Sequence, residues 1–271
     1  MILYKYCDQA GIGILETREL KLPYILDVND PLECMPVIYC PEDKSAIKEN
    51  YLRTCNRNQI SPSDNWEQKL NEQYEKGEIQ NKLKKSARKS LRDLNETSCL
   101  LSVSKTAQDI VMWAHYTEKH KGFAIGIDFD NISPDTNGAP GILMNQVSYS
   151  KDRLQMNVLT EDEYEEVLRK TVSTKSISWI YEEEFRTTFS FNYLEGWQQQ
   201  GLANLKDFNG KKTWFLRLNP ESIREIVFGL YTEDSLKLAI KKLIERPELQ
   251  HVKLYHVEES ETYTFNLVEE N

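Results

Sequence analysis

Two glutamates and an arginine stand at alternate positions within a segment that predicts a β-strand. The segment, Trp179–Phe191, is rich in aromatic and β-branched residues and contains Glu182, Glu184 and Arg186. Because strand side chains alternate between faces, these three share one face, with the two carboxylates about 7 Å apart. Such a set can bind a cationic or hydroxyl-rich ligand, or shift the pKa of one carboxylate. The alternative, which these residues taken alone favour, is a solvated strand face that carries a ladder of ion pairs.

A second group of polar side chains lies earlier in the chain. His115 and Tyr116 fall on a short helix predicted at Gln108–Thr117, and Ser102 falls on a strand predicted at Cys99–Ser104. His115 can donate to a ligand or act as a general base, because its charge changes near neutral pH. In the alternative interpretation the neighbouring aromatic residues pack and His115 satisfies a backbone carbonyl.

Composition limits the classes of function. The chain has 271 residues, enough for a sizeable core, and its net charge of −9 argues against non-specific coating of nucleic acid. The five cysteines contain no CxxC pair and do not cluster with the four histidines, so we expect reduced thiols and no metal. We see no signal peptide and no apolar run of about 18 residues, and therefore expect a cytoplasmic protein without a membrane partner.

Short strands outnumber helices along the chain and do not alternate regularly with them. The clearest predicted strands are residues 1–7, 123–129 and 223–230, and the clearest predicted helices are 161–174 and 232–246. This order, together with the absence of a glycine-rich phosphate loop, argues against a doubly wound nucleotide-binding fold. We expect the α+β class, with a mixed, mostly antiparallel sheet and flanking helices.

Residues 41–97 differ in composition from the rest and predict a charged helical insertion within a single domain that spans residues 1–271. Within the insertion, Lys82–Arg92 carries six basic residues and no acidic one. Such a run can bind nucleic acid, but we favour a solvated helix face. Apolar residues such as Leu70 and Leu91 form a predicted stripe, which either docks against the sheet or offers a surface for a homodimer.

Six short motifs follow one another along nearly the whole chain. They are Tyr4-Lys5-Tyr6, Asn29-Asp30-Pro31-Leu32-Glu33, Cys99-Leu100-Leu101-Ser102, Met112-Trp113-Ala114-His115-Tyr116, Lys121-Gly122-Phe123 and Trp179-x-x-Glu182-x-Glu184-x-Arg186. Their order resembles a widespread bacterial domain family of unknown function that is often linked to abortive phage infection. The insertion at residues 41–97 departs from that family pattern. The resemblance implies a role in phage defence or in toxin-like growth arrest.

The same order is similar, more loosely, to ADP-ribosyltransferases, which carry an aromatic or basic residue on a first strand and a late carboxylate, often as Glu-x-Glu. This resemblance implies NAD as the substrate, Glu184 as the catalytic carboxylate and Glu182 and His115 as its assistants. The residues that it implies for NAD binding are Tyr4, Tyr6, Ser102, Tyr116 and Arg186. Cleavage of the nicotinamide–ribose bond passes through an oxocarbenium-like centre, which a carboxylate stabilises.

We therefore expect an NAD-consuming enzyme, either an ADP-ribosyltransferase with a macromolecular acceptor or an NAD glycohydrolase. One alternative is a non-catalytic module of a defence system that uses the same cleft to sense a nucleotide or a protein. Another is a metal-dependent nuclease, which requires the fold to bring Asp128 and Asp130 to the carboxylates of residues 182–184.

Overall fold

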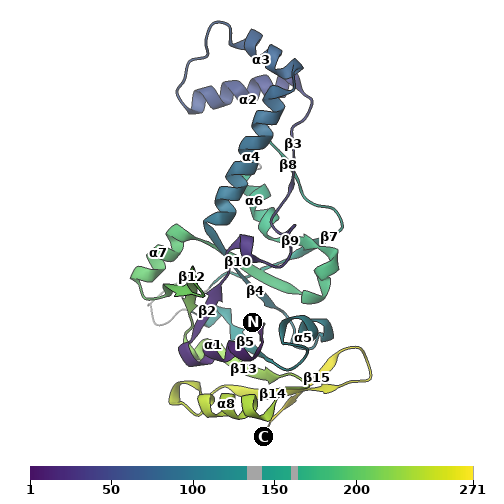
Figure 1. The fold of residues 1–271 in the computed structure, drawn as a ribbon, viewed down its shortest axis with the longest axis vertical. Helices are drawn as coiled ribbons and strands as arrows, with labels where there is room; N and C mark the ends of the chain where they lie inside the picture. Colours follow the sequence, from purple (N-terminus) through teal and green to yellow (C-terminus); the bar gives the residue numbers. More distant parts are fainter. Residues whose placement is uncertain (133–141, 160–163, 271) are drawn as a thin grey trace.

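A mixed eight-stranded sheet forms the centre of the computed structural model, which describes residues 1–132, 142–159 and 164–270 (Figure 1). From edge to edge the strand order is β15-β14-β13-β5-β1-β4-β10-β6. β13 and β14 are parallel, and the other neighbouring pairs are antiparallel. The predicted α+β class with a mostly antiparallel sheet is confirmed. The strands are β1 (Ile2–Cys7), β4 (Ser98–Ser104), β5 (Phe123–Asp128), β6 (Asn145–Gln146), β10 (Glu184–Ser190), β13 (Ile223–Phe228), β14 (Lys253–Glu259) and β15 (Phe265–Glu269).

Three smaller sheets surround the large one in the described part of the chain. An antiparallel sheet has the order β11-β12-β2, and two parallel pairs join β3 to β8 and β7 to β9. Their bounds are β2 (Glu19–Leu22), β3 (Val37–Tyr39), β7 (Ser148–Ser150), β8 (Gln155–Asn157), β9 (Thr174–Ser176), β11 (Ala203–Phe208) and β12 (Lys211–Arg217).

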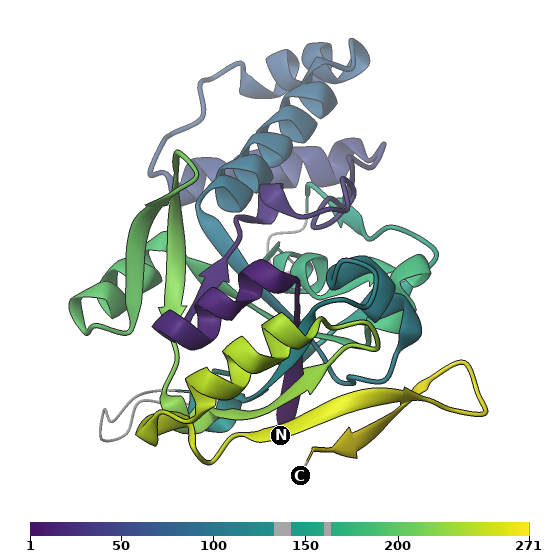
Figure 2. The same cartoon turned by 60° about the horizontal axis from the view of Figure 1, so that its bottom comes forward.

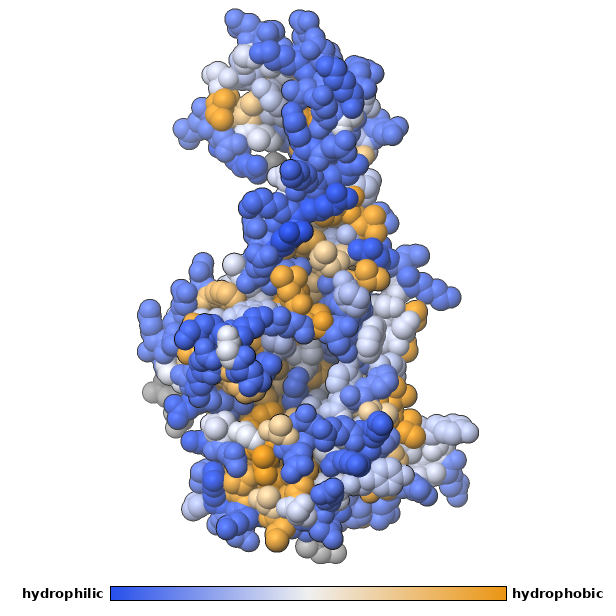
Figure 3. Space-filling model, in the orientation of Figure 1, coloured by the Kyte–Doolittle hydropathy of each residue, from blue (hydrophilic) through white to orange (hydrophobic). Residues whose placement is uncertain are grey.

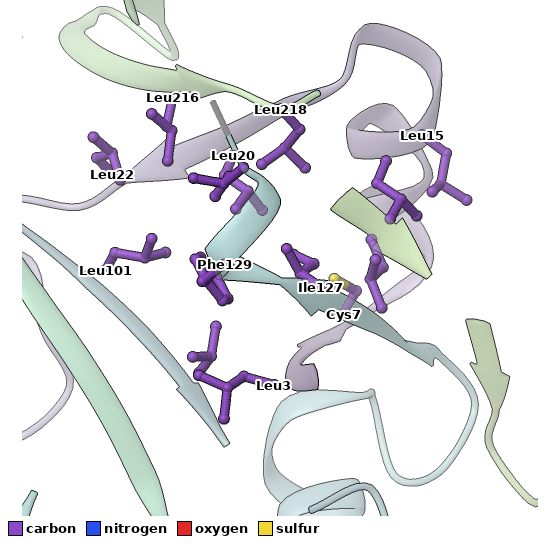
Figure 4. Packing of buried hydrophobic residues seen from close by; sticks show 14 of the residues in the cluster. Leu3, Cys7, Leu15, Leu20, Leu22, Leu101, Ile127, Phe129, Leu216 and Leu218 are labelled. Atoms are coloured by element: carbon purple, nitrogen blue, oxygen red, sulfur yellow. The ribbon is translucent and has the colours of Figure 1, made fainter. Parts of the chain in front are cut away.

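The strand β5 is buried on both faces, and its sequence, Phe-Ala-Ile-Gly-Ile-Asp, is accordingly almost continuously apolar. Along β5, Phe123, Ile125 and Ile127 face the larger hydrophobic cluster, whereas Ala124 faces a smaller one. Figure 4 shows how the larger cluster joins side chains of the main sheet to leucines of β2 and of the end of β12. These leucines are Leu20 and Leu22 of β2, Leu216 of β12, and Leu218, which follows β12 directly.

Helices cover the two faces of the sheet differently. α1 (Ile12–Thr17) and α8 (Asp234–Ile244) lie side by side on the face of the larger cluster (Figure 2). On the other face, α5 (Ile110–Tyr116) buries Met112 and Trp113 in the smaller cluster. α7 (Phe191–Gln199) packs against β10 and β11. None of the described helices combines the length and the hydropathy that are needed to cross a lipid bilayer.

The predicted insertion forms a helical arm that projects from the sheet (Figure 1). The arm consists of α2 (Lys44–Arg57), α3 (Trp66–Glu75) and α4 (Glu78–Glu96). Gly77 separates the last two helices with φ +67°, a conformation that glycine adopts without strain. The apolar stripe is largely covered within the arm, where Leu70 packs with Ile47 and Leu159. Within the basic run, all the basic side chains are exposed except that of Lys84, which is partly buried.

Several boundaries differ from those predicted. The segment before Glu184 is not a strand: residues 177–182 form a 3₁₀ turn and Glu183 has φ +39°. The helix predicted at 161–174 is α6 (Tyr164–Val172), and the first three predicted residues lie outside the described part of the chain.

Candidate functional site

Strand register brings three distant polar positions into one row. On adjacent strands, Tyr4 of β1 lies opposite Ser104 of β4, and Ser104 lies opposite Glu184 of β10. Residues directly opposite each other in a sheet share a face, so these side chains are neighbours across three strands. β1 and β4 pair at that single registered position.

A cavity of about 200 Å³ lies over this row. It includes six of the eight residues that the sequence predicted for the site. Those six residues are Tyr4, Tyr6, Ser102, Tyr116, Glu182 and Glu184. Lys5, Asn29, Glu33, Ser104 and Lys175 also line it. The other two predicted residues, His115 and Arg186, do not line the cavity.

A buried cluster of charges forms one wall of the cavity. The ammonium of Lys175 lies 2.5 Å from Glu182 Oε2, 3.1 Å from Glu184 Oε2 and 3.6 Å from Glu33 Oε2. The Arg186 guanidinium donates through Nε and Nη2 to the two oxygens of Glu184, at 2.9 and 2.6 Å. Its Nη1 lies 2.5 Å from Glu33 Oε1. These five side chains are only 2–5% exposed, so the alternative of a solvated ion-pair ladder is wrong.

The cluster moves the pKa values of its two adjacent carboxyl groups in opposite directions. Burial acts to raise the pKa of Glu184, but Arg186 and Lys175 outweigh it and bring that pKa down to about 2. For Glu182 burial prevails, and its pKa is raised although Lys175 and Tyr116 oppose the shift. Burial also works against the charged form of Lys175, but the three carboxylates outweigh it and raise the ammonium's pKa.

Glu182 keeps more free acceptor capacity than Glu184. Its Oε1 accepts a hydrogen bond of 2.6 Å from the Tyr116 hydroxyl, and its Oε2 accepts the one from Lys175. Asn29 donates to the same tyrosine hydroxyl at 3.2 Å, so the loop before the Asp-Pro turn fixes Tyr116 in place. Both Glu184 oxygens accept from Arg186, and Oε2 also accepts from Lys175. Each Glu182 oxygen therefore retains a free lone pair.

The tyrosines of β1 have their hydroxyl groups engaged by other residues. The Tyr4 hydroxyl donates to Glu225 at 2.5 Å, and the Tyr6 hydroxyl donates to the Thr106 carbonyl at 2.9 Å. Their rings are therefore what they can offer to a ligand in the cavity. Lys5 donates to the Ser102 carbonyl at 3.0 Å, and burial lowers its pKa.

Arg186 and His115 lie outside the cavity for different reasons. Arg186 is fully engaged behind the wall, where it also donates to the Val172 carbonyl at 2.9 Å. His115 is exposed on α5, with Nδ1 3.0 Å from the Tyr181 hydroxyl and its ring edge-on to that of Tyr181. The structure thus brings together the carboxylates, Ser102 and the tyrosines, but not His115.

Sequence reasoning missed Glu33 and Lys175 as members of the site. Glu33 belongs to the Asn29–Glu33 motif, which otherwise predicts only a turn; the turn is what carries its carboxylate into the cluster. Lys175 follows a helix and precedes the 3₁₀ turn, and nothing in its local sequence marks it. Lys175 could be recognised only once it was known that three carboxylates are buried together and need a cation beside them.

The donor set does not resemble a metal centre in the described residues, where no group of three or more His, Cys, Asp or Glu is placed to hold an ion. Asp128 and Asp130 contact the amino group of Met1, at 3.4 and 2.9 Å. Glu182 and Glu184 instead contact Lys175. The nuclease hypothesis therefore gains no support from the placement of these four carboxylates.

Comparison with known proteins gives one partial match. A family model described as "Protein of unknown function (DUF2971)" matches residues 112–187, which is less than half of the chain. The matched stretch runs from α5 through most of β10 and so contains His115, Tyr116, Glu182, Glu184 and Arg186. No curated protein and no solved structure matches the chain. Over residues 112–187 the chain is therefore similar to a protein family of unknown function.

Proposed function

We propose that this chain is a cytoplasmic NAD-consuming enzyme of ADP-ribosyltransferase type that acts in bacterial phage defence or toxin-like growth arrest. The observation that carries the proposal is the buried carboxylate cluster, which forms the wall of a cavity lined by Ser102 and by tyrosine rings. NAD is the proposed substrate, and the acceptor of ADP-ribose is a macromolecule or water. The looser likeness to ADP-ribosyltransferases described above supports the same choice.

The charge balance of the wall suits a reaction centre that becomes positive. When all its members are ionised, three carboxylates face two cations and leave one excess negative charge. Departure of nicotinamide moves the C1′–N bond electrons to the ring nitrogen and leaves positive charge on the ribose. Preorganised negative charge that is shielded from water stabilises such a centre more than bulk water does.

We assign the direct contact to Glu182 rather than to Glu184. Glu182 accepts two hydrogen bonds and retains a lone pair on each oxygen for a ribose hydroxyl, whereas Glu184 already accepts three from Arg186 and Lys175 and retains at most one lone pair. Glu184 then anchors Lys175, and Arg186 anchors Glu184. In this assignment Arg186 is an ion-pair partner and makes no contact with the phosphates of NAD.

The size of the cavity limits which part of NAD it holds. At about 200 Å³ it is smaller than the roughly 300–1,000 Å³ that enclose whole drug-sized ligands. It would therefore take the nicotinamide and its ribose between the tyrosine rings and Glu182. The remainder of NAD would lie outside the cavity, on the side where the exposed Asn29 holds Tyr116.

Release of nicotinamide tests the proposal directly. Purified protein is incubated with NAD, with and without candidate acceptors, and free nicotinamide is quantified by chromatography. We expect Glu182→Gln to lose activity by at least about 100-fold, because it removes a charge next to the reacting carbon. Glu183→Gln is the matched control, since Glu183 is the exposed residue between the two buried carboxylates. Absence of nicotinamide and of any NAD-induced rise in Tm in the wild type would overturn the proposal.

A non-catalytic sensor is the second candidate, and full engagement of Glu184 by ion pairs favours it. In that case the cavity binds a nucleotide or a partner's side chain without turnover. Glu182→Gln would then leave ligand-dependent stabilisation and the cellular phenotype largely intact. A defence-system partner, a homodimer and nucleic acid bound through Lys82–Arg92 remain predictions, of which the last is the least favoured.

A further inference from the structure

A groove of about 500 Å³ runs where the arm meets the rest of the molecule. One side is formed by Arg88, Arg92 and Asn95 of α4, and the other by Leu26, Met35 and Val37. Figure 3 shows hydrophobic surface gathered at this junction, beneath a predominantly hydrophilic arm. The groove is distinct from the cavity of the candidate site, with which it shares no lining residue.

The apolar side of the groove is unusually exposed for side chains of this size. Leu26 is 52% exposed, Met35 42% and Val37 37%. Val37 belongs to β3, a short strand that pairs only with β8 among the described strands, so its other edge has no strand partner there. Exposed apolar surface beside a strand edge that lacks a strand partner is a common docking place for a protein segment.

The opposite side of the groove is positively charged. Arg88 and Arg92 are exposed, stand one turn apart on one face of α4 and form no ion pair with another described residue. Arg153 lies at the groove's end, where it donates to the Met35 carbonyl at 2.6 and 3.1 Å, and Glu96 is the one carboxylate that lines it. This local excess of positive charge contrasts with the net charge of −9 for the whole chain, and it favours an acidic occupant.

Asn95 adds an independent sign of a missing partner. The residue is 1% exposed, and its amide oxygen has no hydrogen-bond partner among the described residues. Its amide nitrogen has a weak contact of 3.9 Å with the Met35 sulfur. Buried polar groups normally have a partner, and the groove is where one could enter.

We propose that this groove docks a protein segment whose apolar side chains are flanked by carboxylates. Leucine-like side chains would fill the space between Leu26 and Val37, and the flanking carboxylates would pair with Arg88 and Arg92. A backbone N–H would then satisfy Asn95. Single-stranded nucleic acid fits less well, because no aromatic ring lines the groove to stack on a base. The proposal does not rest on NAD cleavage.

Methionine-methyl NMR on the 271-residue chain tests the proposal. The chain has five methionines, and a Met35→Leu variant identifies the Met35 resonance. The probe is an acetylated and amidated hexapeptide with two leucines between pairs of acidic residues. Two comparison peptides replace the leucines by serines or the acidic residues by lysines. We expect the first peptide to shift the methyl resonance of Met35. Peptide concentrations up to about 1 mM are used, so that a weak interaction is also detected. The methyl resonance of Met112, which is 6% exposed on α5 and outside the groove, should stay unchanged.

Charge reversal decides whether the binding occurs in the groove. The double variant Arg88→Glu and Arg92→Glu should lower the affinity for the acidic peptide by at least about tenfold, because like charges then face each other. Lys85→Glu is the matched control, since Lys85 is exposed on the same helix but does not line the groove. The proposal fails if the Met35 resonance does not shift or if the lysine or serine peptide shifts it equally. It also fails if the charge-reversed double variant and Lys85→Glu bind the acidic peptide with equal affinity. Movement of Met35 by an RNA oligomer but not by the acidic peptide would also overturn it.

Discussion

Glu182 and Glu184 are two residues apart, yet their surroundings give them different chemistry. Burial acts to raise the pKa of Glu184, but Arg186, which donates two hydrogen bonds to it, and Lys175 outweigh burial and hold that pKa at about 2. Glu182 has a tyrosine and a lysine as donors, and there burial prevails and raises the pKa. Divergent pKa values in neighbouring carboxyl groups are typical of sites that divide the work between an anchor and a reacting group.

The lowered pKa of Glu184 predicts a pH dependence of stability. Because the folded pKa lies below the ordinary value of 4.5, the stabilisation is fully present above about pH 5 and is lost as the pH falls toward 2. The amount is on the order of 3 kcal/mol. Glu184→Gln should lose about 3–5 kcal/mol at pH 7, since it leaves buried cations without a partner, and the deficit should shrink as the pH falls. Urea unfolding at pH 7, 5, 4 and 3 measures this.

The same titration of Glu183→Gln provides the control, because that side chain is exposed and its neutralisation should change stability by no more than about 0.5 kcal/mol. Glu182 cannot replace Glu184 in the test. Its raised pKa means that its ionised form costs free energy in the folded state, so its contribution grows more favourable as the pH falls. If the free energy of unfolding of the wild type and of Glu184→Gln changed with pH in parallel, the Glu184 carboxylate would not be the source of the pH dependence.

The candidate site was partly predictable at the level of single residues. Residue types and chain order were enough to group Tyr4, Ser102, Tyr116 and the two glutamates, and the structure places all of them around one cavity. Lys175 could not be found, because its importance comes from three carboxylates that tertiary packing brings to it. The same packing turns Arg186 away from the cavity, a change that strand alternation alone does not predict.

At the scale of elements, the largest error was the start of β10. Aromatic and β-branched residues favoured a strand from Trp179, but the segment 177–182 is a 3₁₀ turn with Ser176 at its start. The Ser176 side chain accepts from the Ser178 N–H, and Glu183 in the left-handed region ends the turn. Local side-chain hydrogen bonds of this kind compete with strand pairing. The turn is also what points Glu182 toward Lys175 and Tyr116.

Gly122 allows the close approach of β5 to the end of β1. A Cβ added to this residue, just before β5, would lie 2.0 Å from the Cys7 carbonyl oxygen at the end of β1. We expect Gly122→Ala to lower the free energy of unfolding by at least about 2 kcal/mol, since backbone and not a flexible side chain stands in the way. Chemical denaturation measures the change.

Gly196→Ala is the control for this substitution and should have the opposite sign. Gly196 lies within α7, and an added Cβ meets nothing within 4 Å. Replacing a helical glycine with alanine at an unhindered position stabilises a protein by about 0.5–1 kcal/mol. Equal effects of the two variants would show that the close approach at Gly122 relaxes without cost.

On the scale of the whole molecule, the arm and the sheet have different cores. Leu70 packs with Ile47 and Leu159 in a cluster that is separate from the one around β5. The sequence predicted the helices of the arm and the mostly exposed basic face. It could not predict that Leu159, which lies after β8, would complete the arm's core, because this contact joins segments far apart in the chain. Whether the arm and the sheet unfold together is therefore an open test of the single-domain prediction.

Leu70→Ala distinguishes one cooperative unit from two. Removing a buried leucine should cost about 2–5 kcal/mol, and separate cores predict that the loss is confined to the arm. Native-state hydrogen exchange should then show faster exchange in α2 and α3 while the amides of β5 and β13 keep their protection. Leu238→Ala serves as the control, because that leucine is 71% exposed and its loss should leave both regions unchanged. Equal loss of protection in the arm and in the sheet would instead mean that all 271 residues fold as a single cooperative unit.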